Sequence, residues 1–477
     1  MTQCSKAAIE FKTLGKRFVV ADFNGGTITS DAGALLLDKT DQAIGFLNRA
    51  AGCFVDHRDP DLIEHTVEEL IRQRVFGLAL GYEDLNDHDE LSRDSLLATV
   101  VGKCEPTGKD RRNRQDRDRP LAGKSTLNRL ELTSENADAA SRYKKTVLDF
   151  NSMRSLFVDV FLEAHQTPPE QIVIDLDATD DVLHGQQEGR FFHGYYKNYC
   201  YLPLYAFCGE HLLAAELRPS NIDGSAGTVE VMERLVSSIR KRWPSTQIIL
   251  RGDSGFTREE IMAWCEANKV DYALGLAKNS RLTAEIADEL SAAEIEHELT
   301  GKAARCFKDF RYSTLKSWSC QRRVVGKAEH LDKGSNPRFV VTSLADEAWD
   351  ARALYEDLYC ARGEMENRIK EQQMCLFSDR TSTRWMRSNQ IRLWFSSLAY
   401  VLTSGLRRLG LAGTKMARSR CDTIRLKLLK IGASVRVSVR RVLVSLASGY
   451  PLQDLFHQIY SQLQSAIVSR VFCPLRC

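Results

Sequence analysis

The spacing of apolar residues divides the chain into a helical first part, a strand-rich middle and a helical last part. Within the first 150 residues, apolar side chains recur three and four positions apart, which is the spacing of one helix face. One stretch, residues 105–120 (EPTGKDRRNRQDRDRP), interrupts this pattern and has almost no apolar side chain to bury. We expect a solvated loop there, which is either a charged linker or a contact for DNA phosphates.

From residue 171, short apolar runs separated by turn residues predict strands. The runs span residues 172–176, 201–207, 212–217, 248–250 and 272–276. Helical patterns at 227–242 and 257–268 lie between the later strands, so we predict a mixed sheet flanked by helices. Residues 283–338 break this rhythm and are interpreted as an insertion, after which 339–342 resumes a buried strand. A long helix is then predicted from about 350 to 373.

The basic charge of the chain lies in one terminal block. The 477 residues carry a net charge of +3, and residues 401–477 hold thirteen Lys and Arg against two acids, a balance of +11 that leaves −8 for residues 1–400. Such a block favours a polyanionic partner, and we expect it to neutralise DNA phosphates.

Hydropathy and cysteine usage bear on the compartment. No apolar run approaches the roughly 18 residues needed to cross a bilayer. The thirteen cysteines are scattered without a Cys-x-x-Cys pair, which is typical of reduced thiols. We therefore expect a cytoplasmic protein that binds DNA and does not associate with a membrane.

Acidic residues stand at the ends of two buried strands. The first ends IDLDAT, with Asp175 and Asp177, and a later one ends LRGDSG, with Asp253. An ionised carboxylate there is costly unless it is paired, hydrogen-bonded or bound to a cation, and Mg²⁺ prefers carboxylate oxygens. Capping of the following turns would explain one acid better than both. Residues two apart share a strand face, so both Asp175 and Asp177 could reach a metal. We assign the metal to Asp177, nearer the open end, and a supporting role to Asp175.

A third acid comes from the predicted long helix, in the run YCARGEMENRIK. Helical geometry places Tyr359, Arg362, Glu366 and Lys370 on one stripe, whereas Glu364 points elsewhere. An Arg and a Glu four apart often form only a surface salt bridge. The position of this helix after two strand-end acids favours Glu366 as a metal ligand instead.

Three carboxylates from two strands and a helix are the set that a two-metal phosphoryl-transfer site requires. The sequence therefore predicts Asp177, Asp253 and Glu366 as catalytic ligands of two Mg²⁺ or Mn²⁺ ions. One ion would activate water or a 3′-hydroxyl and the other would stabilise the departing oxygen, while nearby Arg or Lys neutralises the phosphate.

Five motifs resemble the bacterial insertion-sequence transposases with a catalytic Asp-Asp-Glu triad, in particular the insertion sequence 1380 family of DDE transposases within the insertion sequence 4 superfamily. They extend over most of the chain and read FNGGTITSDAGALLL, IDLDATDD followed by HGQQEGRFFHGYY, LRGDSGF, GLAKNSRL and YCARGEMENRIKE. The signature around the glutamate matches at Tyr359, Arg362 and Glu366 but departs at Gln373, where the superfamily has a lysine. Lys370, one turn earlier, takes the phosphate-contacting role, so we expect Tyr359, Arg362 and Lys370 to bind DNA.

The resemblance implies an α/β protein with a ribonuclease-H-like catalytic domain, a mostly β insertion and helical flanking regions. We assign residues 1–150 to a helical DNA-binding region, 165–282 and 339–400 to the catalytic core, 283–338 to the insertion, and 401–477 to a basic helical region. It also implies excision of an insertion sequence at its terminal inverted repeats, with or without a hairpin intermediate, and strand transfer into target DNA by a homodimer.

Several alternatives stay open at this stage. The same site would serve a DNA nuclease without strand transfer, and an inactive DNA-binding relic would keep the acids only to stabilise the sheet. By resemblance, residues 184–187 and His193 border the active site, although a lone histidine is more often structural. Trp318 or Trp349 either stacks on an extruded base or belongs to the core.

Overall fold

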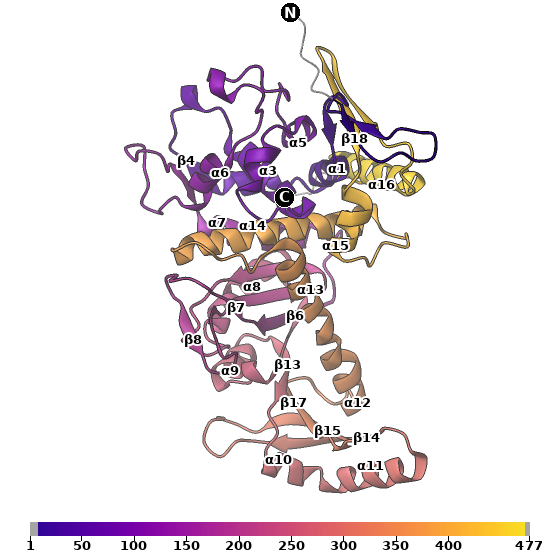
Figure 1. Cartoon of the computed structure of the whole chain (residues 1–477). Helices are drawn as coiled ribbons and strands as arrows, with labels where there is room; N and C mark the ends of the chain where they lie inside the picture. The colour runs from indigo at the N-terminus through magenta and orange to yellow at the C-terminus, as the bar shows by residue number, and fades with distance from the viewer. Residues whose placement is uncertain (1–7, 473–477) are drawn as a thin grey trace, which may run out of the picture. The chain divides into compact units, whose positions relative to one another are not determined.

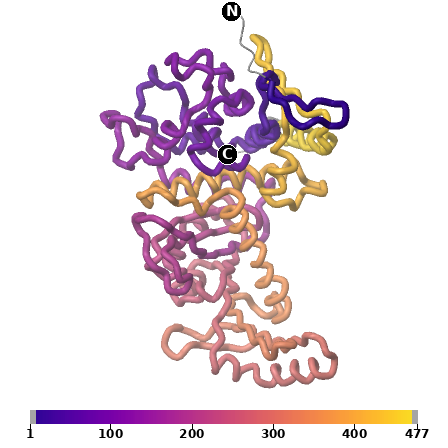
Figure 2. Tube along the Cα trace, in the orientation of Figure 1, coloured from indigo at the N-terminus to yellow at the C-terminus, as the bar shows by residue number. Residues whose placement is uncertain are grey.

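The computed structural model describes residues 8–472 and divides the chain into two compact units (Figure 1, Figure 2). One unit is formed by Met1–Val147 together with Leu402–Cys477, and the other by Leu148–Val401. The outermost residues of the two predicted terminal regions, 1–7 and 473–477, lie outside the described residues. Within residues 8–472, none of the helices combines the length and the apolar character that crossing a membrane requires.

A nine-stranded mixed sheet forms the centre of the second unit. In spatial order its strands are β11 (His211–Glu216), β10 (Leu204–Cys208), β6 (Gln171–Ala178), β12 (Gln247–Gly252), β13 (Asp271–Leu276), β17 (Arg338–Thr342), β15 (Arg322–Leu331) and β14 (Ala304–Tyr312), with β16 (Gly334–Ser335) paired to β15. The neighbours β6, β12 and β13 are parallel, and the other pairs are antiparallel. The apolar run at 201–207 is divided between β9 (Asn198–Tyr201) and β10 at Pro203, which has no N–H to donate to a ladder.

Three helices pack against one face of the sheet: α7 (Phe150–Glu163), α8 (Thr228–Arg242) and α9 (Glu259–Ala267). Side chains of a strand alternate between its faces, and Ile172, Ile174 and Leu176 of β6 are buried in the core on this side. Asp175 and Asp177 therefore lie on the opposite face. Because of this alternation, only a helix on the opposite face of the sheet can contact Asp175 and Asp177.

One long helical segment covers the opposite face. It is continuous from residue 351 to 375 and consists of α12 (Ala351–Ala353), the π-helical η4 (Leu354–Tyr359), the 3₁₀ turn η5 (Cys360–Arg362), α13 (Gly363–Lys370) and the π-helical η6 (Glu371–Cys375). Leu354, Tyr355 and Leu358 pack on Ile249 of β12 and Ala273 of β13. The helix predicted from the sequence is present, and its turns are less regular than an ideal α-helix.

The segment predicted as a β-rich insertion contains helices as well as strands. Helices α10 (Ser280–Glu285) and α11 (Ala287–Thr300) precede the β14–β15 hairpin, and the hairpin extends the main sheet through β17 (Figure 1). Helix α11 has one buried residue, Ala293, so its apolar stripe is too narrow to stand out in the sequence.

Two further features of the second unit lie near the strand ends. A small sheet of β7 (Asp181–Val182), β9 (Asn198–Tyr201) and β8 (Phe191–His193) follows β6. Helix α14 (Met386–Gly405) follows the long helical segment, and the indole of Trp394 donates a 2.9 Å hydrogen bond to the carbonyl of Ala215 in β11.

The first unit is built from the N-terminal and the C-terminal regions of the chain. Its N-terminal part contains β1 (Ile9–Glu10), β2 (Val20–Ala21), β3 (Ile28–Thr29), α1 (Ala34–Ile44), α2 (Leu47–Gly52), β4 (Phe54–Asp56), η1 (Pro60–Leu62), α3 (Val67–Leu80), α4 (Asp87–Leu91), α5 (Ser95–Val101), η2 (Arg114–Asp116) and α6 (Lys124–Glu131), and β4 pairs with β5 (Thr146–Leu148). Helix α3 begins with a capping box between Thr66 and Glu69.

The C-terminal part, predicted as helical, also contains two strands. Its elements are η7 (Leu406–Gly410), α15 (Cys421–Ile424), η8 (Arg425–Leu429), β18 (Ala433–Ser438), β19 (Arg441–Leu446) and α16 (Gln453–Phe472). Val435 and Val437 alternate with polar residues, which is a strand pattern rather than a helical one. Strand β18 pairs with β3, with Ala433 opposite Thr29, so residues some 400 positions apart share one sheet.

Candidate active site

The two strand-end aspartates lie side by side at the carboxyl edge of the parallel strands. Strands β6 and β12 pair with Asp175 opposite Arg251, so the residues two positions further along, Asp177 and Asp253, are at the same level. Asp253 directly follows β12 and caps the 3₁₀ turn η3 (Ser254–Phe256), because its Oδ1 accepts a 2.8 Å hydrogen bond from the amide of Gly255. Capping and membership of an acidic site are therefore compatible at Asp253.

The carboxyl of Asp177 is influenced by several charged side chains at this edge of the sheet. Burial raises the pKa of its carboxyl, the charges of Asp253 and Glu366 raise it further, Arg362 lowers it, and the result is a pKa of about 7. Charged groups change the pKa of a carboxyl in this way only when they lie near it. Asp177 and Asp253 thus follow adjacent parallel strands and the charge of Glu366 acts on Asp177, while the joint catalytic role of the three acids stays a prediction.

Arg362 and Glu366 meet one turn apart on the helix that covers this face. An Arg362 guanidinium nitrogen lies 3.0 Å from Oε1 of Glu366. Burial alone would lower the pKa of Arg362, but Asp177, Tyr359, Asp253 and Glu366 together raise it. The guanidinium therefore serves as a shared counter-ion of the acids rather than as half of an isolated surface pair.

Tyr359 approaches the same edge through a gap left by a glycine. A side-chain carbon added at Gly275 of β13 would collide with the Tyr359 hydroxyl and would lie 3.0 Å from the amide nitrogen of Ser254. Burial raises the pKa of Tyr359, Arg362 lowers it, and the charge of Asp253 raises it. The small residue thus allows the phenol of the helix to sit beside Asp253.

Asp175 is engaged by an arginine and not by the acidic cluster. Its two carboxylate oxygens accept hydrogen bonds of 2.5 and 2.7 Å from the guanidinium of Arg251, which also donates to the carbonyl of Leu358. Both side chains are buried. Burial raises the pKa of Asp175, and Arg251 lowers it. This buried pair ties β6 and β12 to the helix that carries Glu366.

The remaining residues of the predicted helical stripe differ in environment. Lys370 is exposed, as the role of a phosphate contact requires. Gln373, where the resemblance departs, donates a 3.2 Å hydrogen bond to the carbonyl of Asp180 in the loop after β6. Glu364 is exposed, and its charge acts on Asp175, whereas that of Glu366 acts on Asp177.

The donor set suits a hard divalent cation, although the side chains do not form a ready cage. Among residues 8–472, no group of three or more His, Cys, Asp or Glu is arranged so that it could hold a metal ion. Carboxylate oxygens are the ligands that Mg²⁺ and Mn²⁺ prefer, and a cation would offset both the burial and the repulsion that raise the pKa of Asp177. For all three carboxylates to bind one site's ions, Glu366 would have to leave Arg362.

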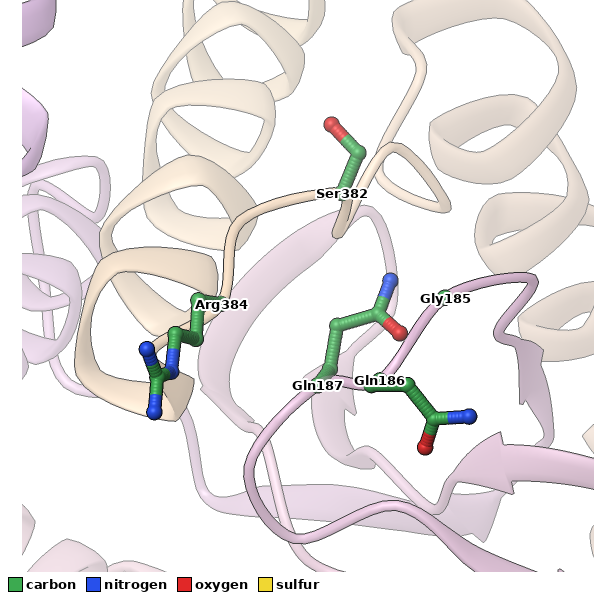
Figure 3. Close-up of a pocket in the computed structure, with 5 residues that line it drawn as sticks. All are labelled: Gly185, Gln186, Gln187, Ser382 and Arg384. Carbon is green, nitrogen blue, oxygen red and sulfur yellow. The ribbon is translucent and has the colours of Figure 1, made fainter.

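A pocket of about 430 Å³ lies between the loop after β7 and the segment before α14. It is lined by Gly185, Gln186 and Gln187 from one side and Ser382 and Arg384 from the other, and Figure 3 shows the Gln187 side chain extending between the two segments. The amide of Glu188 donates to the carbonyl of Arg384 at 2.8 Å, which holds them together. The sequence predicts that the two glutamines border the active site, whereas no motif indicates a role for Ser382 or Arg384.

A second pocket, of about 330 Å³, opens directly beside Asp253. Its lining includes His193, Tyr195 and Tyr196 from the β8–β9 turn, together with Arg258. The aromatic run FFHGYY is visible in the sequence, but its proximity to Asp253 depends on the fold.

A mixed sheet with acids gathered at the carboxyl ends of its parallel strands defines an α/β protein with its site at that edge. The chain belongs to the transposase DDE domain family: the family model described as "Transposase DDE domain group 1" matches residues 11–468. This membership supports a DNA transposase, and the finer assignment to the insertion sequence 1380 family stays a prediction.

Comparisons with individual proteins add little to the family match. None of the curated proteins matches the chain. Among solved structures, the chain is similar to a piggyBac transposase in a synaptic complex with hairpin DNA, with 13% sequence identity, a TM-score of 0.37, and coverage of 94% of this chain and 83% of the other. A likeness at this level decides neither the fold nor the mechanism.

Proposed function

We propose that the protein is a DNA transposase that cleaves and rejoins phosphodiesters at the carboxyl edge of β6 and β12. The observation that carries the proposal is the position of Asp177 and Asp253 at one edge of β6 and β12, where burial, together with the charges of Asp253 and Glu366, raises the pKa of Asp177 to about 7. Together with membership of the transposase DDE domain family, it supports these three residues as the catalytic acids.

The three carboxylates would hold two Mg²⁺ or Mn²⁺ ions. When bound, such ions supply a nucleophile activated at neutral pH and stabilise the leaving oxygen. Glu366 exchanges its contact with Arg362 for a place among the acids, which releases the guanidinium to neutralise the DNA phosphate. Tyr359 places a hydroxyl beside Asp253, and exposed Lys370 binds the phosphate backbone one helical turn further on.

The proposal also assigns a fold to the core, DNA-binding regions to the two ends of the chain, and a reaction to the whole protein. The sheet order β11-β10-β6-β12-β13 supports a ribonuclease-H-like core built from residues 165–282 and 339–400, interrupted by 283–338. Residues 1–150 and the basic block 401–477 would bind DNA, and Asp175 would position the catalytic strands through Arg251. The reaction would be excision of an insertion sequence at terminal inverted repeats and strand transfer, by a homodimer in the cytoplasm.

Cut mapping tests the proposal directly. Purified protein is incubated with DNA that carries the sequences flanking its gene and with Mg²⁺ or Mn²⁺, and the cuts are located at nucleotide resolution. We expect paired cuts at the element ends that require the metal and disappear in Asp253→Asn. Cuts that are insensitive to this substitution would contradict the proposal.

A precleaved element end separates transposition from simple nuclease activity. The end is supplied with supercoiled target DNA, and joined products are measured by sequencing across the junction. Joining by the wild type and its loss in Asp177→Asn support strand transfer. Cleavage without joining would favour the nuclease, and neither reaction would favour the inactive relic.

A further inference from the structure

We propose that the pocket beside Asp253 receives an unpaired nucleobase of the DNA strand being cut, with Tyr195 as the ring on which the base stacks. The inference rests on the proposed function, because it assigns a position to the DNA next to the same acids. It adds a binding site that the carboxylates alone do not predict.

The pocket has the size and the lining that a base requires. Its volume of about 330 Å³ lies at the lower end of the range in which proteins bind small organic groups, roughly 300–1,000 Å³. Tyr195 and Tyr196 contribute apolar faces, while Asp223 and Arg258 contribute polar groups at the rim. A base combines a flat apolar face with a polar edge, so the pocket matches both.

The turn between β8 and β9 fixes the position of the two tyrosines. His193 pairs with Asn198 at the end of the hairpin, and the amide of Lys197 donates a 2.8 Å hydrogen bond to the carbonyl of His193. The Tyr196 hydroxyl donates a 3.2 Å hydrogen bond to the carbonyl of Ala178, the last residue of β6. The turn is thereby anchored to the strand that carries Asp177.

Tyr195 presents its ring to solvent at this anchored position. It is 83% exposed, and its ring meets that of Tyr196 edge to face at a centroid distance of 5.0 Å. Single exposed aromatic residues are common, but Tyr195 also lines the pocket that contains Asp253, a candidate catalytic acid. Stacking on an aromatic ring accepts any base, so this contact suits an enzyme that must hold a strand without reading it.

An unsatisfied polar atom lies on the same turn. Within the described part of the chain, Nδ1 of His193 is shielded from solvent and has no hydrogen-bond partner. The His193 ring lies 4.9 Å from that of Tyr196 and also lines the pocket. Buried polar atoms are normally paired, so this nitrogen is available to the edge of a base.

The two tryptophans considered from the sequence are placed differently. Trp318 packs against the main core and meets Tyr312 edge to face at 5.8 Å, and Trp349 packs against the core on the other face of the sheet. Their packing favours the structural role over base stacking. The stacking ring is therefore assigned to Tyr195.

Photocrosslinking of the full-length chain tests the assignment. The probe is a short single-stranded oligothymidylate in which one base is 5-iodouracil, bound in EDTA so that no cleavage occurs, and the crosslinked peptide is identified by mass spectrometry. Tyr195→Ala removes the ring and Tyr195→Phe keeps it. Phe192→Ala is the matched control, because Phe192 is 57% exposed on the same hairpin but does not line the pocket.

We expect the wild type and Tyr195→Phe to crosslink within residues 191–199. Tyr195→Ala should lose this crosslink and bind the probe at least about fivefold more weakly, as the loss of one stacked base predicts, while Phe192→Ala behaves as the wild type. A Tyr195→Ala protein that crosslinks and binds like the wild type overturns the inference, even where the flanking DNA is still cut and the proposed function stands. A wild type that neither binds the probe nor cuts DNA overturns both.

Discussion

Asp177 shares its end of the sheet with two other acids and one arginine. Burial raises its pKa most, Arg362 lowers it, and Asp253 and Glu366 raise it further. A carboxyl with a pKa of about 7 is partly protonated at neutral pH, and a proton competes with a metal ion for the same oxygens. The site is therefore expected to gain metal affinity as the pH rises through 7.

The raised pKa of Asp177 also predicts a pH-dependent effect on stability. The folded protein holds this proton more tightly than the unfolded chain does, so the contribution of Asp177 is favourable below pH 4 and is lost as the pH rises towards 7. Asp177→Asn removes the buried charge. In metal-free buffer we expect it to raise the free energy of unfolding by about 1–2 kcal/mol at pH 8 and to change it little at pH 4. Urea unfolding at the two pH values measures both, and destabilisation at pH 8 would contradict the assigned environment.

Glu366 and Glu364 form a matched pair for testing the catalytic glutamate. Glu366→Gln keeps the size of the side chain but removes its charge, and should reduce cleavage and strand transfer by at least about a hundredfold, as the loss of a positioned charge typically does. DNA binding should stay close to that of the wild type. Glu364→Gln should cost little, because Glu364 acts on Asp175 and not on Asp177. Activity in Glu366→Gln together with inactivity in Glu364→Gln would show that the helix presents its other face.

Some of these residue environments are predictable from the sequence and others are not. Strand-end acids and a helical stripe are local patterns, so they indicate Asp177, Asp253 and Glu366. The partner of Asp175 is Arg251, 76 residues away, and only the parallel register of two strands places them opposite one another. The proximity of Tyr195 to Asp253 likewise depends on a turn packed against another strand.

Among the elements, the contact between the sheet and the long helix depends on one buried arginine. Arg251 binds Asp175 and the carbonyl of Leu358, so it joins β6, β12 and the helix. Arg251→Ala leaves Asp175 buried without its counter-ion and should lower the free energy of unfolding by about 3–5 kcal/mol. Arg352→Ala removes an exposed arginine that lies 3.8 Å from Glu356 and should cost less than about 1 kcal/mol. Urea unfolding measures both variants. Equal reductions in the free energy of unfolding would show that the buried pair of Asp175 and Arg251 does not stabilise the contact with the helix.

Several features of the helices and strands cannot be predicted from apolar spacing, for physical reasons. The apolar spacing predicts the helix from 351 to 375, but its π-helical and 3₁₀ turns arise from packing and leave no periodic signal. Helix α11 is not predictable in this way because it buries little. Strands β18 and β19 are obscured by the basic residues that dominate their surroundings, although their valines alternate.

At the scale of the whole molecule, the basic terminal block takes part in a fold with the N-terminal region. Strand β18 pairs with β3, and the side chain of Lys430 lies 2.6 Å from the carboxylate of Asp31. Part of the basic charge is thus used within the protein. The sequence carries no local signal for a pairing between such distant segments, which explains why it predicts two separate regions.

The exposed arginines of the β18–β19 hairpin are the best candidates for binding phosphates in this block. Arg436, Arg440 and Arg441 are all exposed. Their joint replacement by Ala should weaken DNA binding and flatten the dependence of log K on log salt by about 0.9 for each phosphate that is no longer bound. Replacing the exposed arginines of the 105–120 loop in the same way tests whether that loop is a linker. An unchanged slope in the hairpin variant would remove this hairpin from the DNA-binding surface.

Asp177, Asp253 and Glu366 are proposed to bind, within one site, the metal ions that cut DNA. Electron paramagnetic resonance of Mn²⁺, titrated into the full-length protein with its flanking DNA, measures that binding without relying on turnover. We predict that the wild type and Glu364→Gln take up Mn²⁺ alike. Asp177→Asn, Asp253→Asn and Glu366→Gln should each bind less Mn²⁺ while still binding DNA. Wild-type occupancy in all three variants would contradict the account.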